Sequence, residues 1–236
     1  MTKVITTDVR GVRLNLAGYT RALELCARMN RETEVLDFID SIPREKVLFD
    51  LGACEGRFAL YAALRGVSCY AFEPEQMNYE ALRTNIELNP AAEKNLTTFN
   101  LAVGNARHQT TIKIGQPWAG GHHKVLSDVS SRVDLDFDFT SEQSVEVVAL
   151  DEFISEAKLP DPDYLKVDID GSEVSFLRGA SKTLRGPSVQ GIIFELHEAD
   201  ASYHEVNGFL SSIAFRAMDR HEVEPGLFNI IFRRGQ

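Results

Sequence analysis

Charged side chains alternate along the segment KVDIDGSE, residues 166–173. Lys166, Asp168 and Asp170 are two residues apart, so they would share one side of an extended strand until that strand ends. A buried strand tolerates such charges only when they are paired, and Lys166 could pair with Asp168 or with Glu195. We expect this segment to form a reaction centre, with Asp168 nearest to the reacting atoms.

A second group of side chains lies on the apolar segment IFELH, residues 193–197, where Glu195 and His197 alternate and would share a face close to Asp168. Where a substrate group has to lose a proton before it can react, histidine is the side chain best suited to remove it near neutral pH. We predict His197 or Asp168 as the general base, with Lys166 or Glu195 fixing its orientation. The alternative is that these groups only tie two neighbouring strands together.

The acidic residues of this region also allow a different interpretation, a Mg²⁺ or Ca²⁺ site. Asp168, Asp170 and Glu173 offer the oxygen ligands that these hard cations prefer. A strand and a helix would direct the three side chains apart, however, so we expect no metal. Undiminished activity after exhaustive chelation would support that expectation.

The stretch VLFDLGACEGRFALYAA, residues 47–63, combines a buried strand, a turn with two glycines and the start of a helix. Asp50, Gly52 and Gly56 follow the spacing D-x-G-x-x-x-G, which differs from the G-x-G-x-x-G of dinucleotide-binding folds. Glycine lets the backbone approach a ligand that a side chain would hold away. Asp50 would place a negative charge near a cationic ligand. A generic strand–turn–helix unit could also produce this pattern.

The strand expected at 67–73 ends in Glu73-Pro74, about twenty residues after Gly52. An acid at the end of a second parallel strand can accept hydrogen bonds from both hydroxyls of a ribose. The alternative is a solvated acid that caps the following helix, because acids favour helix N-termini. The same acid would serve a nicotinamide dinucleotide, so Glu73 alone does not identify the cofactor.

Short apolar strands alternate with helical periodicity from residue 46 onward. This alternation predicts a doubly wound α/β fold, with a seven-stranded, mostly parallel sheet covered on both faces. The tail on either side of Pro225-Gly226 predicts an antiparallel pair that closes one edge. The expected strands are 47–51, 67–73, 96–103, 163–169 and 189–196, and the expected helices are 57–65, 75–88, 173–184 and 200–213.

Residues 1–45 are expected to form an N-terminal extension packed on a main domain at 46–236. The extension would contain a hairpin around Arg10-Gly11 and helices near 17–29 and 31–41.

Residues 104–150 interrupt the alternation and are interpreted as an insertion, with added strands at 110–114 and 144–150. The polar segment between them, 115–143, is long enough to be either functional or disordered. It is either a solvated loop or a lid over the second substrate, in which case deleting 118–132 would impair substrate use and spare cofactor binding. The side chains that could serve such a lid are Trp118, His122 and His123.

The composition suits one globular domain: 236 residues, 44% hydrophobic and 25% charged. The 25 Lys and Arg against 35 Asp and Glu give a net charge of −10, which argues against a nucleic-acid partner. Cys26, Cys54 and Cys69 lack metal-ligand spacing and are expected to be reduced thiols. No apolar stretch approaches a signal peptide or the roughly 18 residues of a membrane span, so we expect a cytoplasmic protein with no membrane partner. The oligomeric state is left open.

Six motifs, in the same order, resemble the FkbM family of S-adenosylmethionine-dependent methyltransferases. The family's D-x-G-A-N-x-G and F-E-P-x-x-x-N-x-x-x-L correspond to DLGACEG at 50–56 and FEPEQMNYEAL at 72–82. Its A-V-G corresponds to residues 102–104. Its L-D and K-x-D-x-E-G-x-E correspond to Leu150-Asp151 and to KVDIDGSE. Its I-x-x-E-x-H falls on residues 192–197, which include IFELH. The resemblance covers roughly residues 46–197.

Two positions depart from the family pattern: Cys54 replaces Asn and Asp170 replaces Glu, which leaves the roles of both positions open. The resemblance implies a site for S-adenosylmethionine, with Ala102 at the adenine edge. The expected cofactor-binding residues are Asp50, Gly52, Ala53, Cys54, Gly56, Glu73, Pro74, Asn78, Asn100, Ala102 and Asp168.

The resemblance further implies methyl transfer to a hydroxyl of a small molecule or glycan, although the same scaffold could methylate an amine. A nicotinamide-dependent oxidoreductase would share the strand–loop–acid layout, but the absence of G-x-G-x-x-G and the second acidic centre at 166–173 argue against it. A third interpretation is a cofactor-binding module that has lost catalysis and acts as a partner protein. Cys54 and Asp170 keep that interpretation open.

Overall fold

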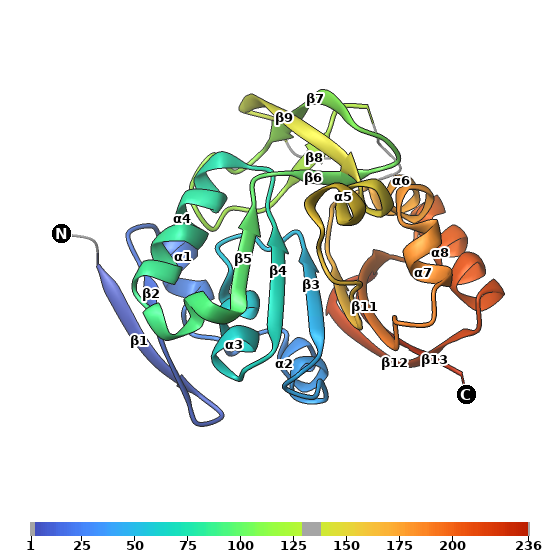
Figure 1. The fold of residues 1–236 in the computed structure, drawn as a ribbon. Coiled ribbons are helices and arrows are strands. Elements are labelled where there is room, and N and C mark those ends of the chain that lie inside the picture. Colours follow the sequence, from blue (N-terminus) through green and yellow to red (C-terminus); the bar gives the residue numbers. More distant parts are fainter. Residues whose placement is uncertain (1–2, 129–137, 236) are drawn as a thin grey trace.

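A seven-stranded sheet runs through the centre of the molecule (Figure 1) in a computed structural model that describes residues 3–128 and 138–235. Its strands are β3 (Val47–Leu51), β4 (Ser68–Phe72), β5 (Leu96–Phe99), β10 (Tyr164–Val167), β11 (Gly191–His197), β12 (Phe215–Glu224) and β13 (Leu227–Arg234). They lie in the order β12-β13-β11-β10-β3-β4-β5. The five strands from β11 to β5 are parallel, which confirms the expected α/β sheet.

The tail forms the expected antiparallel pair. β13 runs against both β11 and β12, so the strand of opposite direction lies one place in from the edge, and β12 is the edge strand. A tight turn at Pro225-Gly226, with Gly226 at a φ of 80°, reverses the chain between the two strands.

Helices cover both faces of the sheet because apolar side chains point to alternate faces along each strand. Leu48 packs in the core on one face and Phe49 in the core on the other. The first face is covered by α2 (Thr33–Asp40), α3 (Arg57–Leu64) and α4 (Gln76–Glu87), and the second by α5 (Leu150–Ala157), α6 (Glu173–Gly179), α7 (Ser181–Arg185) and α8 (Ala201–Ser212). Within the described ranges, no helix has the length and apolar character needed to cross a membrane.

The N-terminal extension contains the expected hairpin, formed by β1 (Val4–Val9) and β2 (Val12–Ala17), followed by α1 (Arg21–Cys26). Buried asparagines fasten this hairpin to the main domain. The Asn85 side chain on α4 accepts a hydrogen bond from the amide of Ala17 at 2.7 Å, and Asn89 accepts one from the amide of Asn15 at 2.9 Å.

The insertion forms a second sheet above the carboxyl ends of the central strands (Figure 1). Its strands are β6 (Ala102–Gly104), β7 (His108–Ile114), β8 (Lys124–Leu126) and β9 (Ser141–Ala149), in the order β6-β9-β7-β8. The two expected added strands are present as β7 and β9. β8, inside the expected loop, was not predicted, and residues 129–137 of that loop lie outside the described residues.

Two expectations about individual elements were wrong, and two elements were not predicted. The strand expected at 96–103 is two strands in different sheets, β5 and β6, because the chain turns at Asn100 and Leu101 to enter the insertion. The helix expected at 173–184 is α6 followed by α7. Gly179 ends α6 so close to β6 that a Cβ would lie 1.9 Å from the carbonyl oxygen of Gly104. α5 was not expected, and a 3₁₀ helix (Pro90–Asn95) precedes β5.

Candidate active site

The turn after β3 brings its backbone against the end of β10. Gly52 has a φ of 81°, a left-handed conformation that side chains rarely adopt, and a Cβ there would lie 1.7 Å from the carbonyl oxygen of Asp168. The amides of Gly52 and Ala53 both donate to the carbonyl oxygen of Phe72, at 3.0 and 2.9 Å. The turn is therefore fixed between the ends of β4 and β10, and only glycine permits its close approach to β10.

Glu73 follows β4 and is buried, with 5% of its surface exposed. Its carboxylate oxygens accept hydrogen bonds from the amides of Cys54 at 2.8 Å and Glu75 at 2.9 Å. Burial raises the pKa of Glu73 to about 7, and the ammonium of Lys124 opposes this rise. The carboxylate is held from two sides by backbone, and it keeps lone pairs for the hydroxyls of a ligand.

A first pocket, with about 660 Å³ of space partly open to solvent, lies where β3, β4 and β10 end. Much of its wall is apolar, with Phe72, Leu101 and Ile112 among the contributors, and Glu73 lines it as well. Seven of the predicted cofactor-binding residues line this pocket: Gly52, Cys54, Glu73, Pro74, Asn78, Ala102 and Asp168.

The other four predicted cofactor-binding residues do not line the first pocket: Asp50, Ala53, Gly56 and Asn100. The Asn100 side chain donates to the carbonyl oxygens of Glu73 at 2.8 Å and Pro74 at 3.0 Å, so it positions the loop that carries the acid. Gly56 faces α4, where a Cβ would lie 2.0 Å from a methyl group of Leu82. These two residues shape the turns around the pocket, and binding by them stays a prediction.

Asp50 lies beneath the turn, 1% exposed, with a carboxylate oxygen 3.2 Å from the ammonium of Lys166. That ammonium also lies 3.3 Å from the Asp168 carboxylate and donates to the carbonyl oxygen of Gly52 at 3.2 Å. Burial raises the pKa of Asp50, and the positive charge of Lys166 opposes this rise. Burial alone would lower the pKa of Lys166, but the negative charges of Asp50 and Asp168 raise it. The expected pair of Lys166 with Asp168 is present, and the negative charge of Asp50 faces this lysine.

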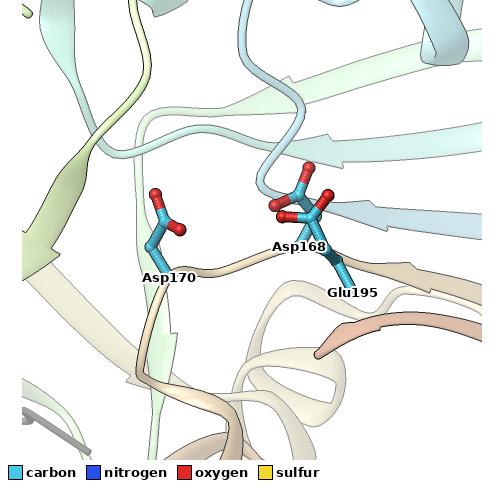
Figure 2. Close-up of side chains that lie close together, drawn as sticks. All are labelled: Asp168, Asp170 and Glu195. Atoms are coloured by element: carbon cyan, nitrogen blue, oxygen red, sulfur yellow. The ribbon is translucent and has the colours of Figure 1, made fainter. Parts of the chain in front are cut away.

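Three carboxylates converge beside the turn (Figure 2). Oxygens of Asp168, Asp170 and Glu195 lie within 4.8 Å of one another, and such a group can accept a proton or coordinate a divalent cation. Burial, followed by the charges of Asp168 and Asp170, raises the pKa of Glu195 well above its usual range. Glu173, expected beside the two aspartates if a metal bound, accepts a hydrogen bond from the amide of Gly171 at 2.7 Å. Glu195 from β11 therefore takes the place expected for Glu173.

A second pocket adjoins the first and is larger, with about 1900 Å³ of space that includes open solvent. Lys166 and Glu195 line it, and so does Ala53. The residues that line both pockets, and so mark their junction, are Gly52, Cys54, His122, Asp168 and Asp170.

His197 lines neither pocket within the part of the chain that the structure describes. Its Nδ1 accepts a hydrogen bond from the amide of Ala199 at 3.2 Å, and its ring lies against Gly226, where a Cβ would be 3.0 Å from Nε2. Of the two residues predicted as general base, Asp168 is at the junction of the pockets, whereas His197 packs against the turn between β12 and β13.

Comparison with known proteins agrees with this geometry. The FkbM methyltransferase domain matches residues 50–217, well over half of the chain. The chain belongs to the FkbM methyltransferase family. It is 23% identical over 159 residues to the hexuronic acid methyltransferase AglP of Haloferax volcanii, a match that covers 67% of this chain and 59% of that protein. It is 28% identical over 188 residues to the 31-O-demethyl-FK506 methyltransferase FkbM of Streptomyces tacrolimicus, covering 72% of each.

The fold of this FkbM-family methyltransferase is also similar to solved structures. The structure of the methyltransferase FkbM from Methylobacillus flagellatus superposes with a TM-score of 0.58 at 15% identity, covering 90% of this chain and 52% of that one. The family assignment makes S-adenosylmethionine the methyl donor. The residues of the first pocket fit this cofactor, because the glycine turn admits a ligand close to the backbone, Glu73 can accept from ribose hydroxyls and the apolar wall suits a purine.

The insertion of this FkbM-family chain covers both pockets. The Asn78 side chain accepts from the amide of Gly120 at 2.8 Å and donates to the carbonyl oxygen of Gly121 at 3.3 Å. The ammonium of Lys124 lies 2.6 Å from the carboxylate of Glu75, and both side chains are buried. Gly121 and Lys124 line the first pocket. The insertion therefore contacts the cofactor side as well, so the geometry does not support a lid that affects only acceptor binding.

The side chains expected to serve the lid differ in position. His122 lines both pockets and His123 lines the second, whereas Trp118 is 43% exposed and lines neither in the described structure. Part of the deletion considered above, 129–132, lies outside the described residues.

Sequence reasoning missed most of the second pocket's walls. They come from the extension, the start of α3, the insertion and the adjoining ends of β12 and β13, and include Glu32, Arg57, Glu222 and Glu224. Arg57 is nearly buried and forms ion pairs with Glu32 and with Glu55. The position of Arg57 directly after the glycine turn was the one feature of the sequence that could have identified a missed wall residue. The other missed residues lie in segments without motifs.

Proposed function

We propose that this FkbM-family enzyme transfers a methyl group to a hydroxyl of a glycan or small molecule bound in the second pocket. The observation that carries the proposal is the junction between the pockets, where Asp168 lines both and Glu195 lies beside it on the second. A relative that is named for methylating a 31-O-demethyl compound supports a hydroxyl acceptor.

S-adenosylmethionine, when bound, supplies an electrophilic methyl group on a sulfonium sulfur. A hydroxyl acceptor must lose its proton as its oxygen attacks, and a carboxylate in hydrogen-bond reach can take that proton. Glu195 suits this role because burial and the charges of Asp168 and Asp170 raise its pKa above the usual range of a carboxylate, which makes it a stronger base than an exposed glutamate. Glu195 thus takes the role proposed for His197, and Asp168 orients the acceptor hydroxyl.

Lys166 is a positioning residue in this scheme. Its ammonium contacts the carboxylates of Asp50 and Asp168 at 3.2 and 3.3 Å and holds the carbonyl oxygen of Gly52. It therefore joins the turn of the first pocket to the carboxylate at the junction. A fixed Asp168 keeps the acceptor oxygen in one place, and positioning of this kind contributes much of the rate of a two-substrate reaction.

The proposal is tested with S-adenosylmethionine, a panel of sugars, uronic acids and other alcohols, and matched amines, with products identified by mass spectrometry. We expect methylated hydroxyl products. Glu195→Gln should lower kcat by roughly 10²-fold or more and leave the Kd for S-adenosylhomocysteine unchanged. Glu198→Gln is the matched control, because Glu198 is exposed, pairs with Arg220 and lines neither described pocket.

Two outcomes would contradict this function. Products formed only from amines would replace O-methylation by N-methylation. Tight binding of S-adenosylhomocysteine without turnover of any acceptor would favour the cofactor-binding module that acts as a partner protein. Calorimetry with NAD in parallel tests the oxidoreductase alternative, which the family assignment already disfavours.

A further inference from the structure

Ser172 carries a buried hydroxyl that has no role in the fold. The residue precedes α6 and is 2% exposed. Its Oγ has no hydrogen-bond partner among the residues that the structure describes. A serine at this position usually accepts a hydrogen bond from an amide of the first helical turn, but the Ser172 side chain makes no such bond.

An unsatisfied buried hydroxyl is costly, and native proteins contain few of them. The neighbouring polar groups are already engaged. The amide of Gly171 donates to Glu173 at 2.7 Å, and the backbone carbonyl of Ser172 accepts from the amide of Phe176 at 2.8 Å. No described residue pairs with the hydroxyl of Ser172, and Ser172 lines the first pocket, where a bound ligand can reach it.

The position of Ser172 within that pocket indicates which part of the cofactor it faces. Residues shared with the second pocket, such as Gly52 and Asp168, mark the end where the methyl group must meet the acceptor. Ser172 lines only the first pocket, together with the apolar side chains of Val103 and Ile112. An apolar wall away from the junction suits the purine ring, which is the apolar end of the cofactor.

Other polar side chains confined to the first pocket already have partners. Glu73 accepts from two amides, Asn78 holds the backbone of the insertion, and Lys124 pairs with Glu75. Adenine carries one hydrogen-bond donor, its exocyclic amino group, which a buried site has to satisfy. A serine hydroxyl can accept that hydrogen bond.

We propose that the hydroxyl of Ser172 binds the adenine base of the cofactor by accepting a hydrogen bond from its amino group. The inference depends on the cofactor assignment and goes beyond the proposed O-methylation, because it concerns recognition of the base. Ser172 is then the residue that distinguishes adenine from purines without an amino group.

The test is calorimetric titration of the wild-type protein and Ser172→Ala with three ligands. These are S-adenosylhomocysteine, methylthioadenosine, which lacks the amino-acid part, and an analogue of S-adenosylhomocysteine whose base is unsubstituted purine. Ser172→Ala should weaken the first two by the same factor, about three- to tenfold, which corresponds to one net hydrogen bond. The wild-type protein should bind the purine analogue more weakly, and Ser172→Ala should cause no further loss.

Ser175→Ala is the matched control on the same helix. Ser175 Oγ accepts from the amide of Asn105 at 3.0 Å and lines neither described pocket, so this variant should lower thermal stability and spare ligand affinity. Ser172→Ala should show the opposite pattern, with a ligand-free Tm that is unchanged or higher, because its hydroxyl has no partner in the fold.

Several outcomes overturn the proposal. One is an unchanged affinity of Ser172→Ala for S-adenosylhomocysteine, and another is a loss of affinity that does not extend to methylthioadenosine. The others are a loss of affinity in Ser172→Ala that is equal for the adenine and purine ligands, and an equal loss of affinity in Ser175→Ala. Failure of the wild-type protein to bind S-adenosylhomocysteine would overturn the cofactor assignment together with this inference. Absence of O-methylation with normal ligand discrimination would contradict only the proposed function.

Discussion

The two pockets are built in different ways. Much of the first pocket comes from the residues that directly follow β3, β4 and β10, which are neighbours in the sheet. The second pocket is completed by the extension, the insertion and the adjoining ends of β12 and β13, which lie far apart in the chain. The first depends on backbone approach and one buried carboxylate, whereas the second is lined by many charged side chains.

Under the proposed function, this difference separates the two substrates of the reaction. Parallel strands bring their carboxyl ends to one edge of the sheet, so a short turn and an acid suffice for a common methyl donor. An acceptor has no fixed structure across a family, and its pocket is formed by peripheral elements that can vary without disturbing the sheet. The insertion is the exception, because Gly121 and Lys124 tie it to the cofactor side.

The largest expected effect tests whether backbone approach controls the cofactor side. Gly52→Ala places a methyl group 1.7 Å from the carbonyl oxygen of Asp168, so the turn has to move away from β10. We expect the Kd for S-adenosylhomocysteine to rise by about 100-fold or more and the free energy of unfolding to fall by roughly 2–4 kcal/mol. Calorimetry and urea denaturation measure the two effects.

Gly11→Ala is the control for this substitution. Gly11 has nearly the same φ, 80°, but a Cβ there meets nothing within 4 Å. Gly11→Ala should therefore lose only about 1 kcal/mol of stability, from backbone strain, and bind cofactor normally. Similar affinities for Gly52→Ala and wild type would contradict the assignment of this turn to the cofactor.

The next effect concerns the charge of Glu73. The ribose hydroxyls need an ionised carboxylate, and the pKa of Glu73 is raised to about 7 by burial. The affinity for S-adenosylhomocysteine should therefore rise as the pH increases through about 7, and binding below that pH should release a proton. Titrations in buffers of different ionisation enthalpy count that proton. Glu73→Gln should flatten the pH profile and bind about tenfold more weakly at high pH.

Lys124 links this charge to the insertion. Loss of its ammonium in Lys124→Met should raise the pKa of Glu73 further and move the midpoint of the affinity profile to higher pH, at about tenfold lower affinity near pH 7. The double variant with Glu73→Gln should show no such movement. If Lys124→Met weakens binding equally at every pH, the lysine acts only through its contact with Glu75.

The same carboxyl affects folding with a definite sign. In the ligand-free protein, the folded state holds the Glu73 proton more tightly than the unfolded chain, whose carboxyl titrates near 4.5. Its contribution to the free energy of unfolding should be fully present below about pH 4.5 and be lost as the pH rises toward 7. Urea denaturation of the wild type and Glu73→Gln across this window checks the sign.

The sequence predicted many of the residues that line the first pocket, because those residues lie in motifs with a physical cause. Gly52 and Glu73 each follow an apolar strand, and the order of strands brings them together. It failed where tertiary context decides. Nothing local shows that the chain changes sheets at Asn100, or that Glu195 joins Asp168 and Asp170 in place of Glu173. The predicted closeness of Glu195 to Asp168 is confirmed, but the approach of both to Asp170 was not predicted.

A smaller effect tests the independence of the acceptor side. Glu224 is exposed, lies at the end of β12 and lines only the second pocket in the described structure. Glu224→Ala should raise the KM for the acceptor a few-fold and leave kcat and the Kd for S-adenosylhomocysteine unchanged, as expected for a residue that contributes uniform binding. Glu205→Ala, on α8 and outside both pockets, serves as the control. A changed cofactor Kd in Glu224→Ala would show that the two sides are not separable.

The smallest effect concerns Cys54, where the family has Asn. Cys54 has a φ of 52°, and asparagine adopts this left-handed conformation more readily than cysteine. Its amide donates to Glu73 at 2.8 Å, a contact that any side chain preserves. Cys54→Asn should therefore raise the free energy of unfolding by about 0.5 kcal/mol, with a cofactor Kd within roughly twofold of wild type. Cys54→Ser, of similar size but without this backbone preference, should give no gain. A stability gain from both variants would assign the effect to loss of the half-buried thiol. An altered Kd in both would mean that the side chain, and not only the backbone, contacts the cofactor.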